Sequence, residues 1–262
     1  MIMKRITSPD NILIKTVKQL KTKKGRDTQG CYIIEGEKSV AEAVIYKAGI
    51  ISIYCSEDFR QSKRLERLDG INDIGLRLIE TDNKTFSSIS DTETPQGVLA
   101  VIRKPDFQII SENWLVLDRI QDPGNLGTIV RTADAAGFGT VIAIKGGSDI
   151  YAPKVVRASA GAFFRIRSTV LDSAGAAVAL ARKHGKKLIA ADPAKGISYF
   201  ETNLTAPLAL IIGNEGGGLN SLFLNNADLC VSIPMRDGAE SLNASVAASV
   251  IMFEAVRQSF RI

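Results

Sequence analysis

The strongest constraint on the fold of this chain is a short apolar run near the C-terminus that ends in a glycine-rich loop. Residues 208–212 read Leu-Ala-Leu-Ile-Ile, a pattern typical of a strand buried on both faces of a parallel sheet. Residues 213–218 read Gly-Asn-Glu-Gly-Gly-Gly, and these glycines allow the backbone to approach a ligand closely. A second apolar run, residues 229–233, is followed by a proline, a loop and a helix expected from about Asn243. Two such strand ends predict a binding crevice at the carboxyl edge of a parallel sheet.

Two familiar nucleotide-binding loops do not fit this glycine-rich stretch. A phosphate-binding P-loop requires Lys and then Ser or Thr after its last glycine, whereas Gly218 is followed by Leu219 and Asn220. The dinucleotide pattern G-x-G-x-x-G fails because Glu215 stands two positions after Gly213, where the second glycine is required. A carboxylate in the loop would also repel a phosphate. The sequence therefore indicates a ligand other than a polyphosphate.

Three motifs along the chain together resemble those of the SpoU family of RNA ribose 2′-O-methyltransferases, within the SPOUT superfamily. The first, at residues 115–133, reads L-V-L-D-R-I-Q-D-P-G-N-L-G-T-I-V-R-T-A. The second is G-N-E-G-G-G-L at residues 213–219, and the third comprises S-I-P-M at 232–235 and S-L-N-A-S-V-A at 241–247. Any one motif alone would be a weak signal, but their order and spacing together make the resemblance specific.

Apolar runs alternate with helical patterns through residues 106–262, which we expect to form one domain. The expected strands are residues 115–117, 141–144, 188–191, 208–212 and 229–233, with a less certain one at 165–170. The expected helices are residues 126–136, 154–160, 173–183 and 243–260. This order predicts an α/β fold with an open, mainly parallel sheet and helices on both faces. On the last helix, apolar side chains spaced by three and four residues share one face: Val246, Val250, Phe253, Val256 and Phe260.

The resemblance adds features that the pattern of elements does not show. Family members thread the C-terminal segment through a loop, which implies a deep trefoil knot in this chain. Sequence patterns alone would argue for an ordinary doubly wound fold, because true knots are almost absent from proteins. The resemblance also implies a homodimer with the active site close to the subunit interface.

Residues 1–105 are expected to form a smaller α/β domain, with Pro105 in the linker that follows it. One helix is expected to begin at Ser8-Pro9-Asp10 and to stop at Gly25. Further helices are expected after Glu37 and around residues 65–68. The expected strands are residues 31–34, 50–55, 76–79 and 98–102.

Two stretches of this first domain, at residues 33–37 and 92–98, resemble the N-terminal domain of many SpoU proteins. That domain is similar to a small ribosomal protein, which implies an RNA-binding role for residues 1–105. Eight Lys and Arg side chains lie between Lys4 and Arg26, and such a cluster can neutralise a phosphate backbone. The candidate RNA-binding residues are Lys18, Lys21, Lys23, Lys24 and Arg26. A solvated basic helix face explains the same charges equally well.

The activity implied by the resemblance is transfer of the methyl group of S-adenosylmethionine to a ribose 2′-hydroxyl of RNA. The methyl group is already activated, so no metal is needed, and the difficulty lies in the weakly acidic hydroxyl. Arg131, six positions after Asn125, corresponds to the family's catalytic arginine. As a general base it would have to be deprotonated near neutral pH, at a cost of roughly 8 kcal/mol. We therefore expect a charged Arg131 that binds an RNA phosphate and stabilises the developing alkoxide.

The resemblance assigns further residues to the reaction and to the cofactor. The other candidate catalytic residues are Asn125, Glu215, Ser241 and Asn243. The candidate cofactor contacts are Gly213, Asn214, Gly216, Ile233, Met235 and Leu242. Some of these have simpler interpretations, because Asn125 follows a D-P-G turn where Asn is a favoured helix cap. One of Ser241 and Asn243 is expected to cap the last helix, which leaves the other free for the cofactor or the RNA phosphate.

Composition narrows the remaining classes of protein. No apolar run approaches ~20 residues, so no membrane span is expected. Cys31, Cys55 and Cys230 lack C-x-x-C spacing and, with the single His184, predict reduced thiols of a cytoplasmic protein rather than a zinc site. His184 precedes Gly185 at an expected helix end, where a histidine suits the helix dipole, so a catalytic role is disfavoured.

The sequence disfavours three alternatives to an rRNA methyltransferase. A tRNA substrate is disfavoured, by analogy, because an added N-terminal domain resembles enzymes that act on rRNA. An RNA-binding protein that has lost catalysis is disfavoured by the joint presence of the candidate catalytic residues. A nicotinamide-dependent oxidoreductase is opposed by the missing dinucleotide pattern.

Overall fold

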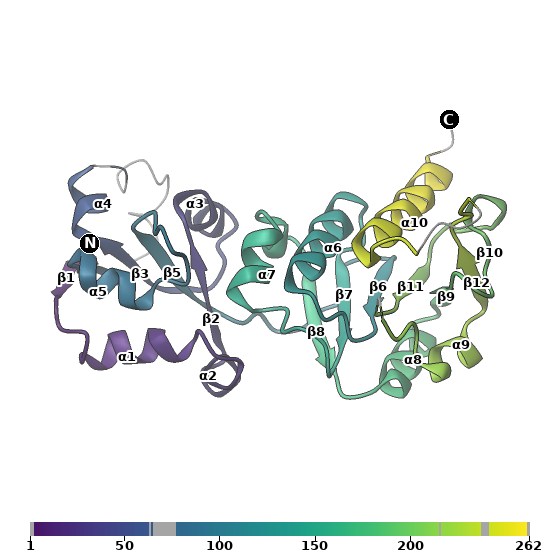
Figure 1. Ribbon diagram of the computed structural model, residues 1–262, viewed down its shortest axis with the longest axis horizontal. Coiled ribbons are helices and arrows are strands. Elements are labelled where there is room, and N and C mark those ends of the chain that lie inside the picture. The colour runs from purple at the N-terminus through teal and green to yellow at the C-terminus, as the bar shows by residue number, and fades with distance from the viewer. Residues whose placement is uncertain (1–2, 63, 65–76, 215, 237–240, 261–262) are drawn as a thin grey trace. The chain divides into compact units, whose positions relative to one another are not determined.

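The computed structural model describes residues 3–62, 64, 77–214, 216–236 and 241–260. The chain divides into two compact units, drawn in Figure 1. Unit 1 contains Met1–Asp106 and Tyr151–Phe164, and unit 2 contains Phe107–Ile150 and Arg165–Ile262. The division after Asp106 lies beside the linker expected at Pro105, whereas the inclusion of Tyr151–Phe164 in unit 1 differs from the expected arrangement.

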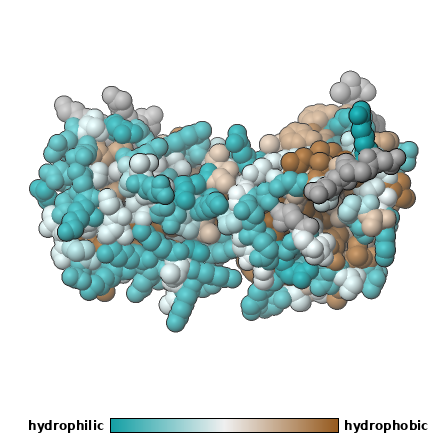
Figure 2. All heavy atoms as spheres, viewed as in Figure 1, coloured by the Kyte–Doolittle hydropathy of each residue, from teal (hydrophilic) through white to brown (hydrophobic). Residues whose placement is uncertain are grey.

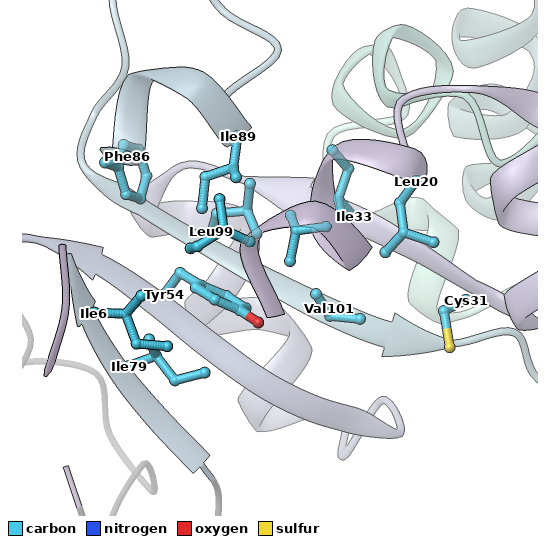
Figure 3. Close-up of a cluster of buried hydrophobic side chains, with 12 residues drawn as sticks. Ile6, Leu20, Cys31, Ile33, Tyr54, Ile79, Phe86, Ile89, Leu99 and Val101 are labelled. Carbon is cyan, nitrogen blue, oxygen red and sulfur yellow. The ribbon is translucent and has the colours of Figure 1, made fainter. Parts of the chain in front are cut away.

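Unit 1 is built on a five-stranded mixed sheet in the order β1-β4-β3-β5-β2. Its strands are β1 (Met3–Ile6), β2 (Cys31–Glu35), β3 (Ile50–Ser56), β4 (Arg77–Thr81) and β5 (Val98–Arg103). The pairs β1–β4 and β3–β4 are parallel, while β5 runs antiparallel to both of its neighbours. The helices are α1 (Ile12–Gln19), α2 (Lys23–Gln29), α3 (Glu37–Ile45), α4 (Glu57–Gln61), α5 (Asn83–Ile89) and α7 (Pro153–Ala158). Figure 3 shows the core beneath α1 and α5, where Leu20, Ile33, Phe86 and Leu99 are buried together.

The first helix differs from the one expected. It begins after Asn11, whose side chain accepts a hydrogen bond from the Leu13 amide, and it ends at Gln19. Gly25 does not stop this helix but lies inside α2, at a position where a Cβ would fall 2.0 Å from the Gln19 carbonyl oxygen. The glycine thus permits the close turn between α1 and α2. The helix expected around residues 65–68 lies outside the described residues.

Tyr151–Phe164, which follows a strand of unit 2 in the sequence, packs within unit 1. The rings of Tyr32, Tyr151 and Phe163 form a buried cluster with centroids 5.1–5.5 Å apart. Arg157 on α7 pairs with Asp91 at 3.0 Å. The helix expected at residues 154–160 therefore exists but is held by contacts with the first part of the chain.

Unit 2 is built on a seven-stranded sheet in the order β10-β12-β9-β11-β6-β7-β8, in which each neighbouring pair is parallel. Its strands are β6 (Trp114–Leu117), β7 (Thr140–Ile144), β8 (Arg167–Leu171), β9 (Lys187–Ala191), β10 (Ile197–Ser198), β11 (Leu208–Ile212) and β12 (Leu229–Ser232). Its α-helices are α6 (Pro123–Ala135), α8 (Ala174–Lys183), α9 (Ser221–Asn226) and α10 (Ala244–Ser259). Helices α8 and α9 cover one face of the sheet and α6 and α10 the other (Figure 1). The expected mostly parallel α/β sheet is confirmed.

The apolar stripe predicted on the last helix does not face the core. Val246, Phe253 and Phe260 are 47%, 48% and 68% exposed. The face that α10 buries holds Ala248, Ile251, Met252 and Ala255 among others, and the helix packs against α6. Figure 2 shows hydrophobic residues, in brown, gathered over the region of α10. The helix is therefore apolar on two faces, of which one remains uncovered.

Candidate active site

The pocket of unit 2 lies where the ends of three neighbouring strands meet the start of α10. It has a volume of about 200 Å³ and is mainly apolar. The end of β9 contributes Ala191 and Pro193, and the ends of β11 and β12 contribute the glycine-rich stretch and the residues after Ser232. Because β9, β11 and β12 are adjacent in a parallel sheet, their carboxyl ends open at the same edge. The crevice expected from the sequence is therefore formed by the chain segments that predicted it.

Most of the candidate cofactor residues line this pocket. They are Gly213, Asn214, Ile233, Met235 and Leu242, and Ser241 lines it as well. Gly216 does not line it, because its amide instead donates to Asn214 Oδ1 at 2.9 Å within the loop. Glu215 lies outside the described residues.

Several lining residues were not expected from the sequence. Pro193 could have been found, since it follows a strand next to the glycine-rich strand in the sheet. Ala244, Ala247 and Ile251 come from α10 at spacings of three and four, but small side chains on a helix give no distinct signal for a ligand. The wall they form depends on where α10 packs.

The glycine-rich loop closes on itself through a short antiparallel bridge. The amide of Asn214 donates to the Gly218 carbonyl at 3.2 Å, and the Gly218 amide donates back at 2.9 Å. A Cβ on Gly213 would fall 2.7 Å from the Gly218 carbonyl carbon, and Gly218 has a φ of +61°. Both positions therefore require glycine for this turn, which supplies backbone rather than side-chain groups to the pocket wall.

Asn125 is not the cap of its helix, contrary to the simpler interpretation. Asp122 caps α6, because its Oδ1 accepts from the Asn125 amide at 2.7 Å, while Pro123 occupies the first turn. The Asn125 side chain bonds elsewhere, since its Oδ1 accepts from Asn243 Nδ2 at 3.0 Å. Asn243 is the residue of the expected pair that caps α10, with its Oδ1 2.8 Å from the Ser245 amide. The cap of α10 is thus also its link to the start of α6.

Arg131 lies on the exposed side of α6, two turns after the start of the helix. Among the described residues, its side chain has no hydrogen bond or ion pair. On the next position, Thr132 Oγ1 lies 3.2 Å from Ser249 Oγ and so joins α6 to α10. The guanidinium of Arg131 is therefore carried by a helix that is joined to α10.

The five candidate RNA-binding residues of unit 1 divide into two groups. Arg26 is only 3% exposed, and its Nη1 donates to the carbonyl oxygens of Leu20 and Lys21. Lys21 is half-buried, and its Nζ donates to the carbonyl oxygens of Ser88 and Ser90 at the end of α5. These two cations hold the fold together. Lys23 and Lys24 are exposed and Lys18 is half-buried, so these three remain candidates for RNA.

No titratable residue is among the described residues that line this pocket. His184 ends α8 and packs against the Trp114 ring with centroids 5.4 Å apart. The three cysteines are free thiols, and burial raises the pKa of Cys55 to about 12. Among the described residues, no three His, Cys, Asp or Glu side chains are grouped to hold a metal ion. No helix in the described parts of the chain is long and apolar enough to span a membrane.

Comparison with known protein families matches both parts of the chain. Residues 112–253 match the SpoU rRNA Methylase family, and residues 11–100 match the MRM3-like substrate binding domain. The 23S rRNA (guanosine(2553)-2′-O)-methyltransferase RlmP of Bacillus subtilis is 34% identical over 252 residues, covering 96% of this chain and 98% of the relative. The 23S rRNA (guanosine-2′-O-)-methyltransferase RlmB of Ralstonia nicotianae is 32% identical, covering 80% of this chain and 88% of the relative.

Two solved structures superpose on nearly the whole of this chain. The SpoU methyltransferase AviRb from Streptomyces viridochromogenes, in complex with AdoMet, superposes with a TM-score of 0.86 at 29% identity, covering 96% of this chain and 99% of the other. The AdoMet-bound rRNA methyltransferase from Sinorhizobium meliloti gives a TM-score of 0.85 at 29% identity, covering 97% and 98%.

Proposed function

The chain belongs to the SpoU rRNA methylase family, and on this premise we propose that it transfers the methyl group of S-adenosylmethionine to a ribose 2′-hydroxyl of ribosomal RNA. One observation supports the proposal above others. The pocket at the strand ends of unit 2 is bounded by the start of α10, whose cap Asn243 bonds to Asn125 on the helix that presents Arg131. The hydrogen bond between Asn243 and Asn125 thus joins the proposed cofactor pocket to the polar groups proposed to bind RNA.

The chemistry of the pocket lining suits S-adenosylmethionine. Gly213 and Gly218 leave no side chain between the backbone and a ligand, and the apolar residues Ile233, Leu242 and Ile251 provide surfaces for an adenine ring. Main-chain groups of Gly213, Ile233 and Leu242 would hold the adenosine. The cofactor supplies an activated methyl group there, so the protein has only to position and stabilise the hydroxyl.

We assign Arg131 and Asn125 to the RNA. A charged guanidinium binds a phosphate through two parallel hydrogen bonds and fixes the ribose in the site. The same positive charge stabilises negative charge that develops on the 2′-oxygen as it loses its proton. Asn125 is held by Asn243 at 3.0 Å, which fixes the orientation of its amide near the hydroxyl. The exposed Ser241 is available for the cofactor or for the phosphate.

Unit 1 supplies RNA binding in this proposal. Residues 11–100 match a substrate binding domain, and Lys23 and Lys24 offer exposed positive charge on α2. Ribosomal RNA is preferred to tRNA, because the two relatives compared above are named for methylation of 23S rRNA. The cytoplasmic location expected from the three separated cysteines stays a prediction.

We also propose a homodimer and a knotted C-terminal segment. The uncovered apolar face of α10, with Val246, Phe253 and Phe260, supports the dimer, since a second copy would remove it from water. For the knot, the support is the path of the chain after β12. This strand lies beside β9, yet the following helix α10 contacts β11 and α6 and brings Leu242 to the pocket at the glycine-rich loop.

The test is methyl transfer from labelled S-adenosylmethionine to 23S rRNA, 16S rRNA and tRNA, each purified from cells that lack the gene. Label in one rRNA species, released as a 2′-O-methylated nucleoside and abolished in Arg131→Ala, is the expected result. Label confined to tRNA would show that the substrate is tRNA rather than ribosomal RNA. Cofactor binding without label in naked RNA or in ribosomal precursor particles would favour an RNA-binding protein without catalysis.

A further inference from the structure

A fully buried carboxylate, Asp118, lies directly after β6 and close to the proposed cofactor loop. Its side chain is 0% exposed, and its amide continues the strand pairing by donating to the Ile212 carbonyl at 2.9 Å. One carboxylate oxygen accepts from Arg119 Nε at 2.8 Å. The other accepts from Arg119 Nη2 at 3.2 Å and from the Asn220 amide at 2.6 Å. The carboxylate therefore contacts both the adjacent Arg119 and Asn220, at the end of the glycine-rich loop.

Arg119 provides a second connection to the same loop through its backbone. It adopts a φ of +59°, a left-handed conformation that an arginine rarely occupies. The bidentate pair with Asp118 offsets this strain and raises the pKa of the guanidinium, which stays charged. In this conformation the Arg119 carbonyl accepts from Asn214 Nδ2 at 3.2 Å. The glycine-rich loop is thus fastened at Asn214, near its start, and at Asn220, near its end.

We propose that Asp118 is a positioning residue that holds both ends of the glycine-rich cofactor loop, at Asn214 and Asn220, in their binding conformation before S-adenosylmethionine enters. This inference rests on the proposed function. A loop with four glycines loses much conformational entropy when it becomes ordered. Where the fold has already ordered the loop, the cofactor does not bear that cost on binding, and its affinity rises. Asp118 acts through the Asn220 amide and through Arg119, and it does not itself line the pocket.

Asp228 offers a control with the same bonding pattern at the amino ends of the strands, where its side chain is 35% exposed. It accepts from Arg182 Nη1 at 2.6 Å and Nη2 at 2.9 Å, and from the Leu188 amide at 2.7 Å. Leu188 lies at the beginning of β9, away from the carboxyl ends that form the pocket. A substitution of Asp228 therefore removes a similar ion pair without touching the cofactor loop.

The experiment compares Asp118→Asn with Asp228→Asn in the full-length protein. We expect Asp118→Asn to raise both the Kd and the KM for S-adenosylmethionine by about tenfold or more, because in either amide orientation the NH₂ group meets an N–H donor of Arg119 or Asn220. RNA affinity should stay within about twofold, since the carboxylate contacts Arg119 and Asn220 and none of the residues assigned to RNA. Asp228→Asn should lower the thermal midpoint but leave the cofactor Kd unchanged. Equal cofactor Kd changes in the two variants, or none in Asp118→Asn, would overturn the inference.

A second pair of variants keeps the inference testable where Asp118→Asn does not fold. Asn220 has a φ of −58°, which proline accepts, and its side chain caps α9. Asn220→Pro and Asn220→Ala both lose the cap, but only the proline loses the amide that Asp118 binds. Weaker cofactor binding in the proline variant alone supports the inference, and equal binding in both variants contradicts it. Failure of the wild-type protein to bind the cofactor would instead overturn the proposed function itself.

Discussion

The side-chain amide of Asn243 donates to Asn125 Oδ1 across 3.0 Å, joining the cap of the last helix to the first turn of α6. Two parts of the chain separated by 118 positions thereby meet beside the pocket of unit 2, which Leu242 and Ala244 line. The same Asn243 oxygen accepts from the Ser245 amide at 2.8 Å. One residue thus fixes both where α10 begins and how the Asn125 amide is oriented.

These two roles of Asn243 can be separated by substitution. Asn243→Asp keeps a good helix cap but loses the donor to Asn125, so stability should change by less than about 0.5 kcal/mol. Its kcat should fall by about tenfold or more, because Asn125 loses its orientation. Asn243→Ala should lose both, with about 1 kcal/mol of stability. Chemical denaturation and single-turnover methylation measure the two effects. A fully active Asn243→Asp variant would show that catalysis does not depend on the orientation of the Asn125 amide.

Arg131 provides a sharper prediction on the chemistry. Arg131→Ala should reduce kcat by about 10²–10³-fold, the usual effect of removing a group that stabilises developing charge. Stability should stay within about 0.5 kcal/mol, because the side chain is exposed. Arg131→Lys keeps the charge but not the bidentate geometry, so it should recover little activity. Near wild-type rates in Arg131→Lys would contradict the bidentate role.

Much of the sheet could be predicted from the sequence, because parallel strands buried on both faces leave continuous apolar runs. Residues 208–212 were predicted as a strand with the same bounds as β11. The pocket residues that contribute backbone groups could also be predicted, because they lie directly after predicted strands. The role of Asn125 could not, because Asp122 competes for the same helix cap and the partner, Asn243, is distant in the sequence.

Burial of charged side chains was the least predictable feature. Lys18 to Arg26 read as one basic cluster, but the turn between α1 and α2 leaves the carbonyls of Leu20 and Lys21 without helix partners. Arg26 satisfies both. Such a role depends on where a helix ends, and the end of α1 was predicted several residues too late.

This division of the basic cluster predicts that one set of substitutions affects RNA binding and the other affects stability. Lys23→Ala combined with Lys24→Ala should weaken RNA binding and reduce the salt slope of log K by about 1–2, with an unchanged thermal midpoint. Arg26→Ala should cost about 1–3 kcal/mol of stability, because it leaves buried carbonyls unsatisfied. Filter binding at several salt concentrations and thermal unfolding distinguish them. A salt slope unchanged in the lysine variant would exclude α2 from the RNA interface.

The uncovered face of α10 makes the last prediction. If Val246, Phe253 and Phe260 meet a second copy, a charge at the centre of that face should separate the subunits, because an unpaired buried carboxylate is costly. Phe253→Glu should therefore run as a monomer in light scattering. Leu222→Glu, on the exposed side of α9, serves as the matched control and should keep the wild-type mass. Methyl transfer should fall with the dimer if the active site lies near the interface. A Phe253→Glu protein that keeps the wild-type mass would place the subunit contact elsewhere.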